Sequence, residues 1–336
     1  MHGWILLDKP LGLGSTQGVS AVKRALREGG YGKFKVGHGG TLDPLATGVL
    51  PIAVGEATKL AGRMLDSDKV YEFTIGFGVQ TDTLDLEGTV IAESEVRPAL
   101  AEIEAMLPRF TGPIAQVPPA YSALKVDGAR AYDLARAGEQ VVLPSRDVTI
   151  HSLTQSSPAR GRWHAKRDGG GGSDSITDGS PPPPTAFGGH LPLAGEDRVS
   201  VPLSEITLTA HVSKGTYIRS LARDIALALG TVGHVTMLRR TKAGPFTLDS
   251  AISLDKLHEA GKARTLEDIL LPLRAGLDDI PALSLTPDQA GLLRRGQVLA
   301  GIAAEAGHYF ACAGETPVAL VEAQDGIVRV VRGFNL

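Results

Sequence analysis

The chain has 336 residues, of which 43% are hydrophobic and 21% charged; this is ordinary globular composition, and the length is typical of two domains. The formal net charge of −3 gives the chain as a whole no attraction for a polyanion, so any surface for nucleic acid must be local. The chain has a single cysteine, Cys312, which excludes an intrachain disulfide framework and a thiolate metal cluster. The sequence has neither an apolar stretch of about 18 residues nor a signal-like start, and we therefore expect a cytoplasmic protein without a membrane segment.

Hydrophobic periodicity predicts helices and strands without the regular alternation of a doubly wound fold. We expect helices over residues 15–26, 98–107 and 216–229, and strands over 70–77, 148–153 and 206–212. The last of these helices has the clearest apolar stripe, and Gly230 supplies its stop. The sequence therefore predicts an α+β fold with a central, largely antiparallel sheet flanked by helices.

Residues 156–198 interrupt this pattern, because nine Gly, six Pro and five Ser fill nearly half of the segment. Such a composition buries too little apolar surface to offset the entropy lost on ordering the chain. We interpret the segment as a flexible insertion that lengthens a hairpin between the strands on either side.

The pattern changes again after residue 275. A short helix over 287–295 and strands near 318–321 and 327–331 predict a small, mostly β unit, close to the lower size limit for independent folding. We therefore predict two domains, 1–275 and 276–336.

Positive charge is concentrated in two distant segments. Residues 1–70 carry nine Lys and Arg against six Asp and Glu, and residues 211–242 carry six against one. Residues 243–336 are acidic, with eight basic against twelve acidic side chains. The two basic segments suit a phosphate backbone, and the alternative is an ordinary solvated helix face.

A glycine-rich loop at residues 37–50 contains one carboxylate, Asp43, and one histidine, His38. Glycine lets the backbone approach a ligand closely or adopt positive φ angles. A lone aspartate in such a loop is a candidate nucleophile or base, and Pro44 biases it away from helical geometry. The structural alternative is commoner, because Asp-Pro also starts helices and turns.

A second candidate is the junction at residues 213–224, where a strand gives way to a helix with Gly215 at the turn. Amides at the helix start, together with Lys214 and Arg219, suit a phosphate or a buried carboxylate, and the alternative is an exposed basic face. Nothing in the sequence around Tyr71 distinguishes it from an ordinary aromatic residue of the core.

Other chemistries lack a pattern in the sequence. The nine histidines are scattered without His-x-x-x-His spacing, and no glycine loop runs into the Lys-Ser/Thr of a phosphate cradle. No serine occupies a nucleophile elbow. The sequence therefore favours neither metal, nor nucleotide-cofactor, nor serine-hydrolase chemistry.

Taken together, ordered segments between residues 3 and 250 resemble the TruB family of tRNA pseudouridine synthases closely. Two departures, Gly14 and Gly39, are expected only to loosen a loop. The similar segments, in the family's order, are residues 8–12, 37–48, 55–59, 66–71, 80–85, 118–125, 213–219 and 234–240.

The resemblance implies isomerisation of the T-loop uridine at tRNA position 55 to pseudouridine, without a cofactor or metal. It implies a pseudouridine synthase catalytic domain, 1–275, followed by a PUA-like RNA-contacting domain, 276–336. In this family Asp43 would be the catalytic aspartate, Arg219 would pair with it, and Tyr71 would pack on the target base. The residues expected to bind the substrate are His38, Lys9, Tyr217, Leu238 and Lys214.

These residue types suit that reaction. A uracil must leave its stack to be reached, which requires an aromatic platform in a pocket. Asp43 could attack the ribose or remove a sugar proton; both routes need an ionised carboxylate, which a nearby Arg219 favours. Tyr71 can stack on the base and later assist removal of the proton from carbon 5.

The expected partner is tRNA, bound through its T-stem-loop by a monomer with no membrane contact and no small-molecule cofactor. Two other functions fit some of the same residues. One is a tRNA-binding or tRNA-folding protein without catalysis. The other is a nucleoside hydrolase with Asp43 as nucleophile, which is disfavoured because a small substrate does not require distributed basic segments.

We expect the insertion at 156–198 to be dispensable, because a segment of this composition adds no packed core. A variant in which a short Gly-Ser linker replaces it should turn over a T-stem-loop at the rate of the full chain. An inactive but folded deletion variant would contradict this.

Overall fold

The computed structural model describes residues 1–122, 124–126, 128–139, 141–156, 201–277 and 279–336. The predicted insertion therefore lies outside the described residues, apart from Ser156. The strands on either side of it, β10 (Arg146–Gln155) and β11 (Glu205–Val212), pair antiparallel with Leu153 opposite Ala210. The predicted hairpin is thus confirmed.

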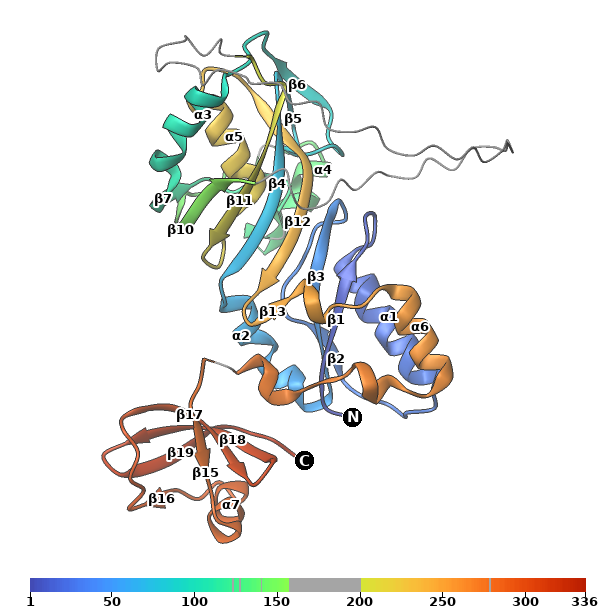
Figure 1. Cartoon of the computed structure of the whole chain (residues 1–336), viewed down its shortest axis with the longest axis vertical. Helices are drawn as coiled ribbons and strands as arrows, with labels where there is room; N and C mark the ends of the chain where they lie inside the picture. The colour runs from blue at the N-terminus through green and yellow to red at the C-terminus, as the bar shows by residue number, and fades with distance from the viewer. Residues whose placement is uncertain (123, 127, 140, 157–200, 278) are drawn as a thin grey trace, which may run out of the picture.

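One large mixed sheet forms the body of the molecule (Figure 1). Its strands lie in the order β14, β1, β3, β12, β4, β11, β10, β7, with β2 beside β3 and β13 beside β12. Among its described strands only β12 and β3 pair in parallel, so the largely antiparallel sheet is confirmed. The remaining bounds are β1 (Gly3–Lys9), β2 (Val36–His38), β3 (Ala46–Val54), β4 (Lys69–Phe77), β7 (Gly112–Gln116), β12 (Gly233–Ala243), β13 (Phe246–Thr247) and β14 (Leu271–Pro272).

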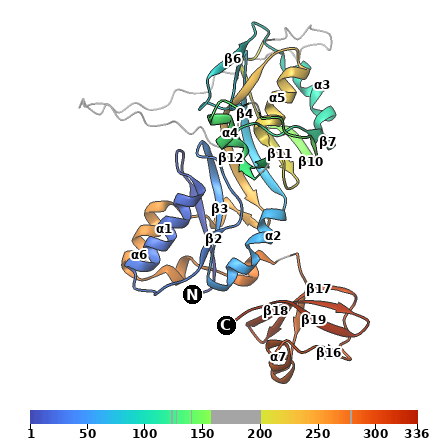
Figure 2. The ribbon, with the colours of Figure 1, turned by 180° about the vertical axis from the view of Figure 1, so that it is seen from behind.

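Helices cover the two halves of this sheet separately (Figures 1 and 2). Helices α1 and α6 pack side by side over β1 and β3, and α5 packs over β4 and β12. Each half has its own apolar core, centred on Ile5 and Leu50 in one and on Phe73 and Leu221 in the other. The helices are α1 (Ser15–Glu28), α2 (Ala61–Asp66), α3 (Leu100–Met106), α4 (Ala131–Arg136), α5 (Ile218–Ala228) and α6 (Leu254–Ala263).

The helices and strands predicted from periodicity are confirmed to within a few residues, and their ends differ for local reasons. Helix α5 begins two residues later than predicted, because Gly215 has a φ of +81° and Tyr217 is still extended. Helix α3 also begins two residues later than predicted, and the chain continues past its end as a 3₁₀ helix, Leu107–Phe110, which contains Pro108.

Strand β12 lies at the centre of the sheet, yet periodicity did not predict it. It joins the two halves, because it pairs with β3 on one side and β4 on the other. Its sequence is rich in charge, and Arg239 and Arg240 read as surface residues. Arg240 is in fact buried, and its guanidinium donates to the carbonyl oxygens of Val49, Gly40 and Thr41.

Gly48 is required where β3 passes β12. Its φ is +100°, and a Cβ at this position would lie 2.2 Å from the carbonyl oxygen of Arg240. We expect Gly48→Ala to lower the free energy of unfolding by about 2 kcal/mol or more, through backbone strain and loss of the β3–β12 pairing. Chemical denaturation measures this.

The matched control for that change is Gly62→Ala. Gly62 lies in α2 at an ordinary φ, and a Cβ there would meet nothing within 4 Å. Because alanine favours helix over glycine, this variant should be neutral or more stable by about 0.5–1 kcal/mol. Equal effects of the two substitutions would refute the argument for Gly48.

A second sheet forms a C-terminal β-rich domain, as predicted. Its strand order is β15, β17, β18, β19, β16, and α7 packs against it. Phe310 and Phe334 fit into the apolar cluster around Trp4, and Lys59 donates to the carbonyl oxygen of Gly333 at 2.8 Å, so this domain is anchored to the body. Its elements are β15 (Ala282–Ser284), α7 (Pro287–Arg294), β16 (Leu299–Ala300), β17 (Gly307–Ala313), β18 (Thr316–Gln324) and β19 (Ile327–Gly333).

Smaller elements complete the described chain. Within the described residues, no helix combines the length and the apolar character needed to cross a membrane. The short strand pairs are β5 (Val79–Thr81) with β6 (Val90–Glu93) and β8 (Lys125–Val126) with β9 (Ala129–Arg130), and further 3₁₀ helices span Gly55–Leu60, Leu248–Ser250, Leu266–Ile269 and Leu273–Gly276.

Candidate active site

An open cleft of about 1030 Å³ lies where the two halves of the large sheet meet. The loop between β2 and β3, strand β4, the segment before α5 and strand β12 all contribute to its lining. The sequence candidates that line it are His38, Asp43, Tyr71, Tyr217, Arg219 and Leu238. Side chains from residues 38 to 238 therefore converge on one site.

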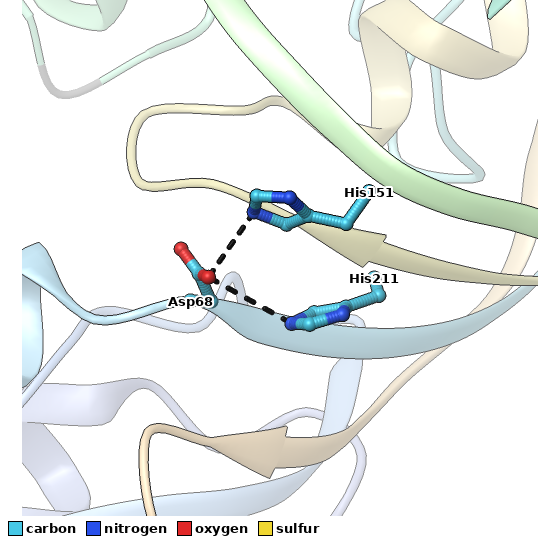
Figure 3. A group of neighbouring side chains, drawn as sticks. All are labelled: Asp68, His151 and His211. Atoms are coloured by element: carbon cyan, nitrogen blue, oxygen red, sulfur yellow. Dashed lines mark ion pairs between the residues drawn. The ribbon is translucent and has the colours of Figure 1, made fainter. Parts of the chain in front are cut away.

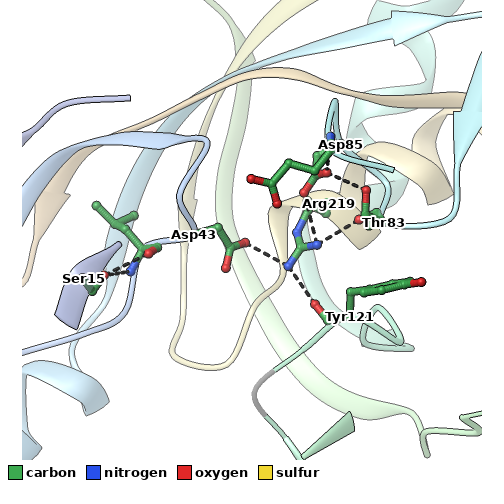
Figure 4. Close-up of polar contacts among 8 residues, drawn as sticks. Ser15, Asp43, Thr83, Asp85, Tyr121 and Arg219 are labelled. Carbon is green, nitrogen blue, oxygen red and sulfur yellow. Dashed lines mark hydrogen bonds and ion pairs between the residues drawn. The ribbon is translucent and has the colours of Figure 1, made fainter. Parts of the chain in front are cut away.

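The backbone on both sides of Asp43 is fixed. The Ser15 hydroxyl donates to the carbonyl oxygen of Leu42 at 2.9 Å and accepts from the Leu42 amide at 2.8 Å (Figure 4). The carbonyl oxygen of Pro44 accepts from the amide of Gly12 at 2.9 Å and from Lys9 Nζ at 3.1 Å. The aspartate is thus held on a rigid loop, while 44% of its side chain stays exposed to the cleft.

Arg219 connects Asp43 to the opposite wall of the cleft. Its guanidinium lies 2.9 Å from Asp43 Oδ2 and 3.2 Å from Asp85 Oδ2, and it donates to the carbonyl oxygens of Thr83 at 2.8 Å and Tyr121 at 3.0 Å. Figure 4 shows the guanidinium between the two carboxylates. Only 8% of the Arg219 side chain is exposed, so its orientation is set by these four acceptors. The juxtaposition of Asp43 and Arg219 implied by the resemblance is present.

Asp85 is a site residue that sequence reasoning missed. Its side chain is 9% exposed, and its Oδ1 accepts from the Thr83 hydroxyl at 2.6 Å and the Glu87 amide at 3.0 Å. These bonds hold the Asp85 carboxylate in place, and this carboxylate in turn positions Arg219. The available signal was the run of residues 80–85, which belonged to the resemblance but received no role.

Tyr71 and Leu238 form the apolar side of the site. Both pack against the two cores of the sheet, and Leu238 also lines a small recess of about 20 Å³ beside Asp43 and Arg219. The position of Tyr217 is set by Gln116, whose side chain bonds both the amide and the carbonyl of Tyr217. A planar ring can therefore lie with its face against these side chains and with its polar edge toward the Asp43 carboxylate.

His38 enters the cleft as a neutral donor or acceptor. Burial, with a contribution from the Arg240 charge, lowers its pKa below the usual 6.5. Its Nδ1 accepts from the Gly40 amide at 3.4 Å. The imidazole is therefore uncharged at pH 7.

Gly39, beside it, does more than loosen the loop. A Cβ at this position would lie 2.7 Å from Cβ of Met64. The expectation for this residue is therefore wrong: the close packing of the loop on α2 requires glycine.

Two of the expected substrate contacts lie outside the cleft lining. Lys9 is fully buried, and its Nζ donates to the carbonyl oxygens of Pro10, Leu13 and Pro44, so it supports the Asp43 loop from below. Lys214 is exposed and forms an ion pair with Asp66 at 2.9 Å, while its neighbours in sequence line the cleft.

Lys9 predicts a specific pH dependence of stability. Burial lowers its pKa from 10.5 to about 8, although the Asp43 charge acts in the opposite direction. Between these two pH values the unfolded chain binds a proton that the folded chain has lost, so this group makes the free energy of unfolding rise with pH. Below pH 8 both states bind the proton, and the contribution is constant.

The comparison with Lys9→Met isolates this effect. Urea denaturation of both chains between pH 7 and pH 10 should show a difference in unfolding free energy that is flat up to about pH 8 and then shifts in favour of the wild type. A difference that stays constant up to pH 10 would mean that Lys9 keeps an ordinary pKa.

The charge count of the sequence overstates the basic surface. Lys9, Lys69, Arg219 and Arg240 all belong to the two basic segments, and all four are buried. For these residues the interpretation as a solvated face is wrong, because they hold backbone carbonyls and carboxylates around the site.

The exposed cations of the cleft come from elsewhere. Arg130 and Arg136 line it from β9 and α4, with their guanidinium groups 5.9 and 5.5 Å from the centre of the Tyr132 ring. Nothing in the sequence had singled them out.

Comparisons with known proteins identify relatives of this chain. The model of the TruB family pseudouridylate synthase (N terminal domain) matches residues 26–166, and that of the tRNA pseudouridylate synthase B C-terminal domain matches residues 219–278. The tRNA pseudouridine synthase B of Novosphingobium aromaticivorans is 61% identical over 336 residues, which are 100% of this chain and 98% of that protein. The chain belongs to the TruB family. The tRNA pseudouridine synthase B of Zymomonas mobilis is 53% identical over 335 residues, covering 100% of this chain and 96% of that protein.

Membership of the TruB family confirms the predicted enzyme class, a pseudouridine synthase and thus an isomerase. Asp43 lies within the first matched region, and the second contains Arg219, β12 and α6. That second region belongs to the large sheet and ends before the five-stranded one.

Solved structures confirm the fold. A chain of an H/ACA RNP bound to a substrate RNA containing 2′-deoxyuridine matches with a TM-score of 0.65 and 20% identity, over 99% of this chain and 85% of that one. A chain of a Cbf5-Nop10-Gar1 complex matches with a TM-score of 0.66 and 22% identity, over the same shares. The TruB-family chain therefore has the pseudouridine synthase fold expected from its sequence.

Proposed function

We propose that this chain isomerises the uridine at position 55 in the T-loop of tRNA to pseudouridine, with Asp43 as the catalytic residue. The observation that carries the proposal is the Asp43–Arg219 ion pair at the base of an open cleft in a TruB-family chain. The relatives at 61% and 53% identity are named for tRNA, which supports tRNA as the substrate.

The reaction rearranges one nucleotide. The target base leaves its stack and lies against Tyr71 and Leu238, with its ribose near Asp43. The bond from the anomeric carbon to nitrogen 1 breaks, and a bond from that carbon to carbon 5 forms. Carbon 5 then loses its proton to solvent with help from Tyr71, and nitrogen 1 gains one. The atoms and electrons balance, so the proposed steps call for no redox group or external nucleophile.

Asp43 serves this reaction by either of two routes. It attacks the anomeric carbon, or it removes a ribose proton to give a glycal-type intermediate. Arg219 and Asp85 position the carboxylate, and His38 and Tyr217 bind the flipped nucleotide at the rim. Both routes require the carboxylate to be ionised and to face the sugar.

Cations at the surface supply the backbone contacts. Arg130 and Arg136 are exposed at the cleft, where their guanidinium groups would meet phosphates of the stem, and the exposed Lys214 would add a further contact. In the proposed second domain, 276–336, four exposed arginines offer a further RNA contact: Arg294, Arg295, Arg329 and Arg332. We also propose that the enzyme acts as a monomer in the cytoplasm.

Tritium release tests the proposal against its alternatives. A T-stem-loop carrying tritium on carbon 5 of the target uridine should release its label to water, and a loop labelled only at a stem uridine should not. Binding without release would identify a tRNA-binding or tRNA-folding protein. Free uracil among the products would identify a hydrolase and overturn the isomerase mechanism.

A further inference from the structure

Three side chains with metal-binding atoms meet on the surface of the sheet; none of the three lines the cleft, although the adjacent residues Lys69 and Val212 do. Asp68 lies immediately before β4, three residues ahead of Tyr71, while His151 belongs to β10 and His211 to β11. Asp68 Oδ2 lies 3.1 Å from Nε2 of His151 and 3.8 Å from Nε2 of His211, and all three ligand atoms lie within 4.8 Å of one another. Figure 3 shows both rings directed at the same carboxylate.

A β-bulge brings the two histidines to the same side. The register of β10 and β11 shifts between Ile150 and Ser152, so His151 is the extra residue of the bulge. In an unbroken ladder, successive side chains alternate between faces, and this added residue redirects His151 towards His211. The two ring centres lie 4.7 Å apart. The sheet therefore builds this cluster from strands that are distant in sequence.

The donor set fits a borderline divalent cation. Two imidazole nitrogens and one carboxylate oxygen are common ligands of Zn²⁺, which binds them at about 2.0–2.2 Å in tetrahedral geometry. Neighbouring ligand atoms of such a tetrahedron are roughly 3.4 Å apart, and the two distances from Asp68 fall on either side of this value. Between 37% and 47% of each of the three side chains is exposed, so small rotamer changes can close the site.

The charges around the cluster set its strength. The Asp68 carboxylate supplies one negative charge that attracts a cation, while the positive charge of the nearby Lys242 opposes it. A site with three protein ligands leaves its fourth position to water.

We propose that Asp68, His151 and His211 form a Zn²⁺ site on the sheet surface, independent of the isomerisation. The bound ion joins β4, β10 and β11, and so holds the hairpin to the strand that carries Tyr71. Because it binds only the folded chain, it raises the thermal midpoint of unfolding.

Zinc binding to the full chain tests the proposal. Protein purified without a histidine tag and stripped with a chelator is titrated with ZnCl₂ against a chromophoric chelator. We expect one Zn²⁺ per chain, bound at least about tenfold more weakly in His151→Gln, His211→Gln and Asp68→Asn. Thermal unfolding with and without ZnCl₂ should show a rise in midpoint that these variants lose.

The matched control is His258→Gln. His258 is also exposed and lies 3.3 Å from a carboxylate, that of Glu28, but no other histidine of the described residues joins it in a metal-binding group. This variant should keep the zinc affinity of the wild type. The proposal would be overturned if the affinity for Zn²⁺ were unchanged in the three cluster variants, or if His258→Gln lost it equally. A chain that takes up no Zn²⁺ would also overturn it. The cluster would then be a histidine–carboxylate ion pair only.

Discussion

Asp43→Asn is expected to reduce the turnover of a T-stem-loop by about 10³-fold or more, while affinity for the RNA changes by no more than a few fold. Asparagine has the size and shape of aspartate but can neither attack the ribose nor accept a ribose proton at a useful rate. Single-turnover tritium release gives the rate, and a filter-binding titration gives the affinity.

Stability should be little changed by this substitution. Arg219 keeps Asp85 and the carbonyl oxygens of Thr83 and Tyr121 as partners, so no buried charge is left alone. The loss of turnover therefore reports on chemistry and not on folding.

The matched control is Asp279→Asn. Asp279 forms an ion pair of similar length, 2.8 Å to Arg63, but it is exposed and does not line the cleft. It should keep the turnover and the affinity of the wild type. An Asp43→Asn chain that turns over as fast as this control would remove Asp43 from the mechanism.

Local structure could be predicted from the sequence because it depends on near neighbours. Helix α1 and strands β4 and β11 follow from the spacing of apolar residues, and each begins within a residue of its predicted start. Strand β12 could not be found in this way. Its Arg240 is bonded to backbone carbonyls and its Arg239 to the side chains of Asp8 and Thr47, all from distant segments, and hydrophobic periodicity does not register such pairing.

In the candidate site, too, local sequence indicated some residues but not the contacts between distant ones. Asp43 could be proposed from its loop, but its pairing with Arg219 came only from the family resemblance, because no local rule connects residues so far apart in sequence. Asp85 received no role, since its importance lies in contact with Arg219. The pairing of the strands that carry His151 and His211 was predicted, but the β-bulge that turns the two histidines to the same side was not.

Arg219→Met is the second substitution from which we expect a large effect, both on the free energy of unfolding and on turnover. Removing the guanidinium leaves Asp85, only 9% exposed, as a buried charge whose partner is gone. Breaking a buried ion pair from one side costs about 3–5 kcal/mol of unfolding free energy. Turnover should also fall, on the order of 10²-fold or more, because the Asp43 carboxylate then loses the ion pair that orients it. Arg219→Lys should be intermediate in stability, since one ammonium cannot reach four acceptors.

A double variant separates the two effects. In Arg219→Met/Asp85→Asn the buried charge is removed together with its partner, so much of the lost unfolding free energy should return. Turnover should stay low, because Asp43 still lacks the group that fixes it. Denaturation and tritium release on the same preparations give both quantities. If turnover recovered along with stability, Arg219 would act only by holding the fold, and the ion pair to Asp43 would have no part in positioning the carboxylate.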